Sequence, residues 1–168
     1  MFDLKEKKKI PLLGVEAQIY EHSLFSCKHI HLDCESTEKS FVVAFRTIPK
    51  DSTGVAHILE HTVLCGSKRY PVRDPFFMMI RRSLSTFMNA MTSQDTTMYP
   101  FSSVNDQDFK NLLDVYLDAT FFPNLNELDF MQEGHRYEIE KGKNNEEKLL
   151  LKGVVYNEMI CAMSSVHS

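Results

Sequence analysis

Two histidines and a glutamate lie within one five-residue segment, His57-Ile58-Leu59-Glu60-His61. On a helix, residues four apart share a face about one turn apart, so both imidazoles could converge on one ion. Neutral imidazole suits Zn²⁺, and a nearby carboxylate that can take a proton from a water on the ion makes a hydrolase. The order His-x-x-Glu-His is the inverse of the commoner His-Glu-x-x-His. The pattern indicates a hydrolytic zinc site, with a merely solvated helix face as the alternative.

The residues around the motif predict the helix that must carry it. Asp51 to Thr53 are favourable cap and first-turn residues. Gly66 follows Cys65, where a helix over about 55–65 would end in a left-handed conformation. An apolar stripe runs beside the histidines, formed by Ile58, Leu59, Val63 and Leu64. We therefore expect a half-buried helix whose histidines face the floor of a cleft, with Cys65 as a small core residue.

A catalytic zinc ion needs a third protein ligand and one position left open for water. Glu158 follows an apolar, strand-like run and begins a segment with helical character, so its carboxylate could point into a cleft. Three other glutamates compete, namely Glu133, Glu138 and Glu140. Their regular charge spacing, on a helix predicted over about 124–140, is typical of a solvated surface. Spacing alone favours Glu158 without excluding the others.

The apolar periodicity predicts paired strands with helices between them. The predicted strands cover 15–22, 26–33, 41–48, 86–92, 96–102 and 149–155. Asp74-Pro75 predicts the start of a short helix, and Asn105 caps another that ends before Pro123. Pro100 suggests an irregular or edge position. This order favours a layered α+β domain over a doubly wound parallel sheet.

Composition narrows the function classes. The 168 residues suffice for one domain with a core, and the contents of 43% hydrophobic and 25% charged residues are those of a globular protein. A net charge of −4 gives no electrostatic argument for nucleic acid, and no apolar run is long enough to predict a membrane span. The N-terminal segment resembles neither a secretory signal nor a transit peptide. Four cysteines without a Cys-x-x-Cys pair are expected to be reduced thiols.

Several segments together resemble one peptidase family. Residues 54–67, which contain the motif, resemble the zinc segment of the inverzincin peptidases, the pitrilysin/insulysin family M16. Residues 68–77, 83–90 and 116–123 resemble the presequence protease branch in particular, and Gly153-Val-Val-Tyr-Asn-Glu-Met159 is similar to its distal motif. The resemblance runs from about residue 10 to residue 160, in order and at the expected spacing.

The resemblance implies a role for each site residue. His57, His61 and Glu158 would bind one Zn²⁺ ion, and Glu60 would be the general base. Zinc would activate water and polarise the scissile carbonyl of an unstructured peptide, such as a targeting presequence. Residues 87–92 resemble the edge strand on which these enzymes hold an extended substrate, with Asn89 and Ala90 as the expected contacts.

The sequence also departs from the family, whose members of this branch have four related domains in two halves that close around a chamber. We expect residues 1–168 to form a truncated N-terminal zinc-binding domain, incomplete at its C-terminus, that lacks the half needed to close the chamber. Such a chain would have little activity alone. A non-catalytic peptide-binding or assembly subunit of the same fold is the alternative. The expected location is a bacterial cytoplasm, with the mitochondrial matrix as the alternative.

Overall fold

The computed structural model describes residues 1–142 and 146–164, which divide into two compact units, Met1–Thr37 and Glu38–Ser168. The first unit is an antiparallel sheet of β1 (Phe2–Ile10), β2 (Val15–His22) and β3 (Lys28–Asp33), in that order, with the 3₁₀ turn η1 (Pro11–Leu13) between β1 and β2. The predicted hairpin of β2 and β3 is confirmed. Strand β1 was not predicted, because nearly all of its side chains are exposed and its charged run gives no apolar alternation.

The second unit contains a sheet of antiparallel pairs. It has β4 (Lys39–Arg46), β7 (Thr96–Ser103) and β5 (Ser85–Met88) in that order, and β6 (Met91–Thr92) also pairs with β7. Pro100 does not mark an edge, because β7 is central, but it does mark the predicted irregular position. It lies opposite Val42 on β4, and on its other side β5 ends at Met88 and β6 begins only at Met91. In this interruption the Pro100 carbonyl accepts a hydrogen bond of 3.1 Å from the backbone N–H of Asn89.

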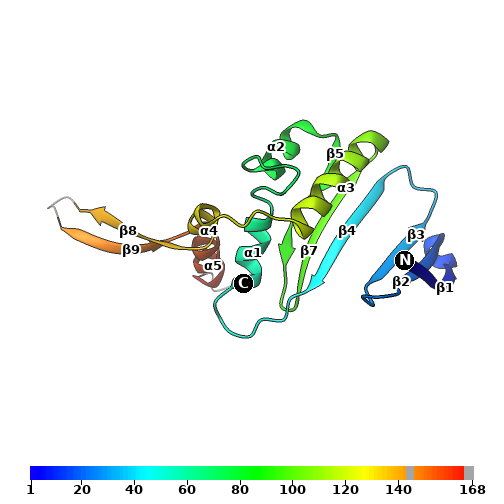
Figure 1. The fold of residues 1–168 in the computed structure, drawn as a ribbon, viewed down its shortest axis with the longest axis horizontal. Coiled ribbons are helices and arrows are strands. Elements are labelled where there is room, and N and C mark those ends of the chain that lie inside the picture. Colours follow the sequence, from blue (N-terminus) through cyan, green and yellow to red (C-terminus); the bar gives the residue numbers. More distant parts are fainter. Residues whose placement is uncertain (143–145, 165–168) are drawn as a thin grey trace. The chain divides into compact units, whose positions relative to one another are not determined.

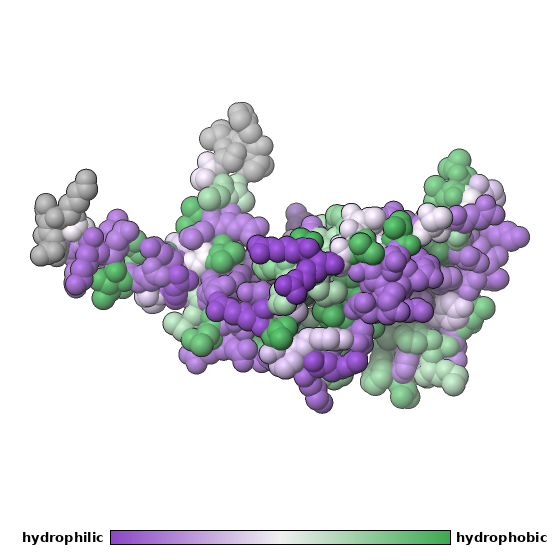
Figure 2. Space-filling view, turned by 90° about the horizontal axis from the view of Figure 1, so that it is seen from above, coloured by the Kyte–Doolittle hydropathy of each residue, from purple (hydrophilic) through white to green (hydrophobic). Residues whose placement is uncertain are grey.

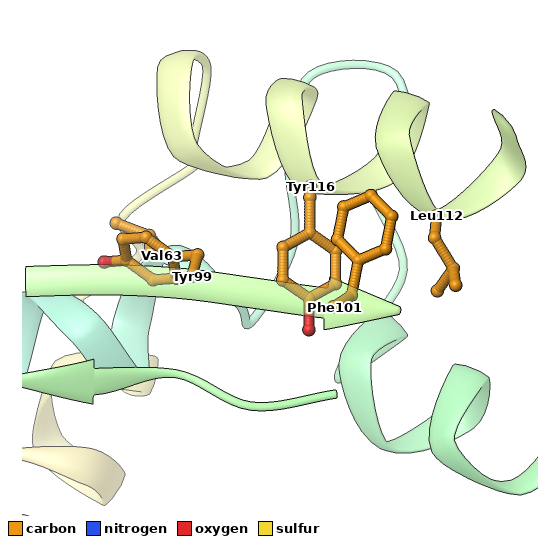
Figure 3. Close-up of a cluster of buried hydrophobic side chains, with 5 residues drawn as sticks. All are labelled: Val63, Tyr99, Phe101, Leu112 and Tyr116. Atoms are coloured by element: carbon orange, nitrogen blue, oxygen red, sulfur yellow. The ribbon is translucent and has the colours of Figure 1, made fainter. Parts of the chain in front are cut away.

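The core lies between this sheet and the helix α3 (Asp106–Phe121), which runs along the sheet in Figure 1. Phe101 of β7 and Tyr116 of α3 have ring centroids 4.8 Å apart, and both side chains are almost fully buried. Figure 3 shows them side by side between helix and strand, with Val63 against Tyr99. As predicted, α3 starts at an Asn105 cap, whose Oδ1 accepts hydrogen bonds from the backbone N–H groups of Gln107 and Asp108.

Two helices precede β5. They are α1 (Val55–Val63), within the predicted helix, and α2 (Pro75–Arg82), which starts where Asp74-Pro75 predicts. The predicted cap of α1 was wrong, because its N-cap is Gly54 at φ 72° and Asp51 instead accepts a hydrogen bond of 3.0 Å from the backbone N–H of Thr53. The predicted end at Gly66 was also wrong, because α1 ends at Val63 with Leu64 as a right-handed C-cap. Gly66 lies beyond the helix at φ 141°, and a Cβ there would lie 3.0 Å from the carbonyl oxygen of Val72.

A projecting hairpin separates the last two helices (Figure 1). The chain forms α4 (Glu127–Glu133), β8 (Arg136–Lys141), β9 (Glu147–Lys152) and α5 (Val154–Ser164). The prediction of one helix reaching about Glu140 was wrong, because α4 ends at Glu133 and the residues after Gly134 form the strand β8. The strand predicted over 149–155 is observed as β9, which starts and ends a few residues earlier. The next helix, α5, contains Glu158. The hairpin in Figure 2 is mostly hydrophilic, with a few apolar groups between.

The strands and helices confirm the predicted α+β class. In the second unit, antiparallel strands are packed against helices, and no element repeats a parallel strand–helix–strand unit within the described residues. Among these residues, no helix combines the length and apolar character needed to cross a membrane.

Candidate metal centre

The motif helix α1 brings its two histidines and its glutamate together as the spacing predicts. The ring centroids of His57 and His61 lie 5.1 Å apart. Ligand atoms of His57, Glu60 and His61 all lie within 4.8 Å of one another. Glu60 is 6% exposed, so its carboxylate lies in the wall of the site rather than in bulk solvent. The alternative of a solvated helix face does not fit this burial.

Helix α5 places Glu158 against both imidazoles. Its Oε2 lies 3.7 Å from Nε2 of His57 and 3.7 Å from Nε2 of His61. Ligand atoms bound to one tetrahedral zinc ion at normal bond lengths are about 3.4 Å apart. The spacing of the Glu158 oxygen to each of the two nitrogens is thus within a few tenths of an ångström of the spacing on a shared ion. The donor set and its spacing fit zinc.

Glu133 also reaches the site, although its charge spacing predicted a solvated surface position. Its Oε2 lies 3.0 Å from Nδ1 of His61, on the opposite side of the ring from Glu158, and its side chain is 12% exposed. The hydrogen bond to Glu133 raises the pKa of His61, and the same bond lowers the pKa of the Glu133 carboxyl. Glu138, by contrast, forms ion pairs with Arg136 and Lys152 in the hairpin. The prediction of a solvated surface position was therefore wrong for Glu133.

These residues line a cavity of about 620 Å³. Its wall includes Asn89 and Ala90, the two expected substrate contacts, which lie between β5 and β6. The backbone carbonyl of Asn89 accepts a hydrogen bond of 3.4 Å from the Tyr116 hydroxyl, and the Asn89 side-chain oxygen accepts one of 2.9 Å from the N–H of Ala90. These hydrogen bonds fix the backbone of Asn89, and Ala90 also packs against the core. The structure brings both residues to the same cavity as the histidines.

Cys65 lines the same cavity but has the character of a core residue, as expected. It is 8% exposed, and burial raises the pKa of its thiol to about 12. Its sulfur donates a weak hydrogen bond of 3.5 Å to the carbonyl oxygen of His61. A thiol that stays protonated is a poor zinc ligand, since zinc binds the thiolate.

Two imidazoles and a carboxylate beside a buried glutamate, at an open cavity, are the groups that a metallohydrolase site requires. The comparison with protein families agrees: the model of insulinase (Peptidase family M16) matches residues 46–164. The match covers more than half of the chain, so this chain belongs to the M16 peptidase family. Members of this family are in general zinc-dependent peptidases.

Curated relatives narrow the resemblance to one branch. The chain is 56% identical over 158 residues to "Presequence protease, mitochondrial" of Mus musculus, which covers 94% of this chain and 15% of that protein. It is 52% identical over 164 residues to the protein of the same name from Yarrowia lipolytica, covering 98% and 16%. The resemblance to the presequence protease branch is confirmed. The chain spans about 15% of the length of these relatives.

The crystal structure of pitrilysin has the same fold, with a TM-score of 0.61 over 76% of this chain and 14% of that chain, at 19% sequence identity. The expected pitrilysin-like fold is thereby confirmed. The names of the relatives place them in mitochondria, so the expected bacterial cytoplasm has no support, whereas the mitochondrial alternative agrees with them.

Proposed function

We propose that this chain carries the zinc-binding and proton-transfer residues of a metalloendopeptidase that cleaves unstructured peptides, targeting presequences among them. The observation that carries the proposal is the position of Glu158, whose one oxygen is 3.7 Å from Nε2 of both motif histidines. Residues 101 positions apart in the chain converge there, and a solvated helix face gives no reason for this convergence. The names of the relatives support the choice of presequences.

Each residue has one role in the proposed reaction. His57, His61 and Glu158 would hold the ion, which when bound would supply Lewis-acid polarisation of the scissile carbonyl and lower the pKa of a bound water. Glu60 accepts a proton from the attacking water and later passes it to the leaving amine. Its burial beside the histidines keeps the carboxylate close to the position at which that water would stand. The water oxygen adds to the carbonyl carbon to form the new C–O bond, and the C–N bond of the peptide then breaks as the leaving amine takes the proton from Glu60.

The edge formed by β5 and β6, with Asn89 and Ala90 in the segment between them, is the proposed support for the substrate. It lies at the outer side of the β4–β7–β5 sheet and in the wall of the cavity. An extended peptide could add to this edge through main-chain hydrogen bonds, which tolerate many side chains. This mode of binding suits a peptidase whose substrates differ in sequence but share an extended conformation.

Zinc binding is the first test of the proposal, because it does not depend on turnover. The purified chain is dialysed free of metal and titrated with Zn²⁺ in a calorimeter. We expect one ion per chain, with binding lost in His57→Ala and His61→Ala. A chain that binds no zinc, or binds it equally well without both histidines, would contradict the proposal.

Hydrolysis separates the peptidase from the alternative subunit. A quenched fluorescent presequence peptide is incubated with the zinc-loaded chain and with its Glu60→Gln variant. We expect slow, chelator-sensitive cleavage that the variant lacks. Cleavage that survives the chelator or persists in Glu60→Gln would contradict the proposed mechanism, and tight peptide binding that neither zinc nor Glu60→Gln affects would support a non-catalytic peptide-binding subunit. We also propose a mitochondrial matrix location, which fractionation of the source cell with an antibody against the chain would test.

A further inference from the structure

One carboxylate in the site has no role in the proposed reaction. Glu133 is the last residue of α4, and its Oε2 lies 3.0 Å from Nδ1 of His61. It is therefore on the far side of the ring from Nε2, which faces Glu158 at 3.7 Å. At 12% exposure, the side chain is too enclosed for an ordinary surface carboxylate. A buried charge of this kind needs a partner, and His61 is one of its partners.

The other oxygen of Glu133 is held as well. Gln132 donates a hydrogen bond of 2.9 Å from Nε2 to Oε1 of Glu133. Arg73 in turn donates from its guanidinium to the side-chain oxygen of Gln132, and it also lies 3.7 Å from the carboxylate of Asp74. The loop before α2 is thus connected to His61 through two side chains of α4. Both oxygens of the Glu133 carboxylate are fixed in direction.

The consequence concerns which nitrogen of His61 carries the proton. A carboxylate accepts but does not donate, so it selects the tautomer with hydrogen on Nδ1. The lone pair then lies on Nε2, which points at Glu158 and at the space between the two histidines. In the part of the chain that the structure describes, no carboxylate forms a hydrogen bond or an ion pair with Nδ1 of His57, whose ion pair is at Nε2. The two histidines therefore differ in how firmly they are oriented.

We propose that Glu133 is a positioning residue for His61, and that Gln132 and Arg73 hold its carboxylate in place. The chain of contacts fixes the tautomer and the ring orientation before any ion binds. It reduces the reorganisation that metal binding would otherwise require, and carboxylate partners of this kind change metal affinity by roughly 10–100-fold. The inference rests on the proposed zinc site, in which His61 is a ligand.

The direct test is the tautomer of His61 in the metal-free chain, which requires neither zinc nor activity. Nitrogen-15 NMR of the imidazole rings, at a pH where the rings are neutral, distinguishes hydrogen on Nδ1 from hydrogen on Nε2. We expect His61 of the wild-type chain to carry hydrogen on Nδ1, and Glu133→Ala to shift it toward the mixture found in free histidine. An unchanged ring spectrum in Glu133→Ala would overturn the proposal.

Zinc affinity is the second readout, measured by competition with a chromophoric chelator. We expect roughly 10–100-fold weaker binding in Glu133→Ala, and smaller losses of affinity in Gln132→Ala and Arg73→Ala. The matched control is Glu127→Ala, which removes an exposed carboxylate from the first turn of the same helix and should leave affinity unchanged. Equal affinities in Glu133→Ala and Glu127→Ala would contradict the proposal.

A second variant and the metal-free measurement keep the role of Glu133 testable if Glu133→Ala fails to fold or the chain binds no zinc. If Glu133→Ala does not fold, Glu133→Gln replaces it: its neutral amide accepts more weakly and can also donate, so intermediate tautomer and affinity values are expected. Wild-type values in both readouts for Glu133→Gln would overturn the proposal. A wild-type chain that binds no zinc would refute the proposed function, while the metal-free ring spectrum would still decide whether Glu133 orients His61.

Discussion

At the scale of single residues, the site separates three carboxylates by their surroundings. Glu60 is buried in α1, Glu133 is enclosed against one side of His61, and the Glu158 side chain is 55% exposed on the other side. The accessible carboxylate suits a ligand that meets an ion entering from the cavity. The buried carboxylate of Glu60, next to both histidines, suits a general base because its surroundings hold it close to the reacting water. Local environment therefore gives each glutamate a different role.

Replacing the proposed base tests this division. Glu60→Gln keeps the volume and the helix but removes the proton acceptor. We expect zinc binding to be retained and peptide hydrolysis to fall by roughly 10²–10⁴-fold, the usual contribution of general base catalysis. Calorimetric zinc titration and a fluorescent peptide assay on the same preparation measure both. Loss of zinc together with activity would make Glu60 a ligand instead.

The cysteines give a prediction that depends on pH. Burial raises the pKa of Cys65 to about 12, so its thiol is protonated at pH 8 and slow to alkylate. Cys27, Cys34 and Cys161 are exposed. We expect iodoacetamide at pH 8 to label these three well before Cys65, as read by peptide mass spectrometry. Labelling of Cys65 as fast as the exposed thiols would show that the cavity wall is not closed around it.

The sequence could predict the residues of α1 because both the motif and the helix are local. It could not predict Glu133, because its burial depends on where α4 stops and how α4 lies against α1. Charge spacing along residues 127–140 is compatible with a solvated helix. Only the contact with His61, 72 residues away in sequence, distinguishes a functional carboxylate from a surface one.

At the scale of elements, two glycines allow α4 and α5 to approach α1. Gly134 ends α4 and Gly153 precedes α5, and the hairpin between them pairs Arg136 with Lys152 at its base. A Cβ on Gly153 would lie 1.9 Å from the carbonyl oxygen of Gly134. The backbones can be this close only without a side chain. This contact holds the two helices close together. Glu133 at the end of α4 and Glu158 in α5 therefore lie on opposite sides of His61.

Gly153→Ala should therefore damage both stability and the site. We expect an unfolding free energy lower by about 1–3 kcal/mol, as for overpacking, and weaker zinc binding because α5 must shift. Urea unfolding and zinc titration measure the two effects. Gly142→Ala in the same hairpin is the matched control, since its Cβ would meet Glu146 at an ordinary 3.5 Å. Equal behaviour of the two variants would contradict the role given to the glycine contact.

Element boundaries were the least predictable part of the fold. The sequence predicted the hairpin of β2 and β3, the α3 cap and the helix start at Asp74-Pro75. Strand β8 was not predicted, because the charged residues continue at helical spacing beyond Gly134 and so indicated a longer helix. Strand β1 was not predicted either, because a strand exposed on most of its length has no apolar alternation. In both cases tertiary pairing, which one sequence does not reveal, decides the structure.

At the scale of the whole molecule, the site joins elements from distant parts of the second unit. The α1 histidines, the β5–β6 edge and the α4 and α5 carboxylates meet at one cavity. A ligand that binds only this arrangement favours the folded chain. The fold class was predictable, because the order of paired strands and helices stays the same when each predicted boundary is wrong by a few residues.

Zinc should therefore stabilise the chain against unfolding. At a free zinc concentration of about 100 times its dissociation constant, linkage gives about 2.7 kcal/mol of added stability. We expect a higher melting temperature with zinc than with a chelator, and a smaller rise in Glu158→Gln. Differential scanning calorimetry measures both. The same rise in wild-type and Glu158→Gln chains would exclude Glu158 as a ligand.

The most direct test of the central claim is the coordination of zinc in the loaded chain, read by X-ray absorption spectroscopy. We expect two imidazole nitrogens with oxygen ligands at about 2.0–2.2 Å, without sulfur. In Glu158→Gln, we expect the oxygen ligands to change while both imidazole ligands remain. A zinc–sulfur distance of about 2.3 Å, or a spectrum unaffected by His57→Ala, would contradict the central claim.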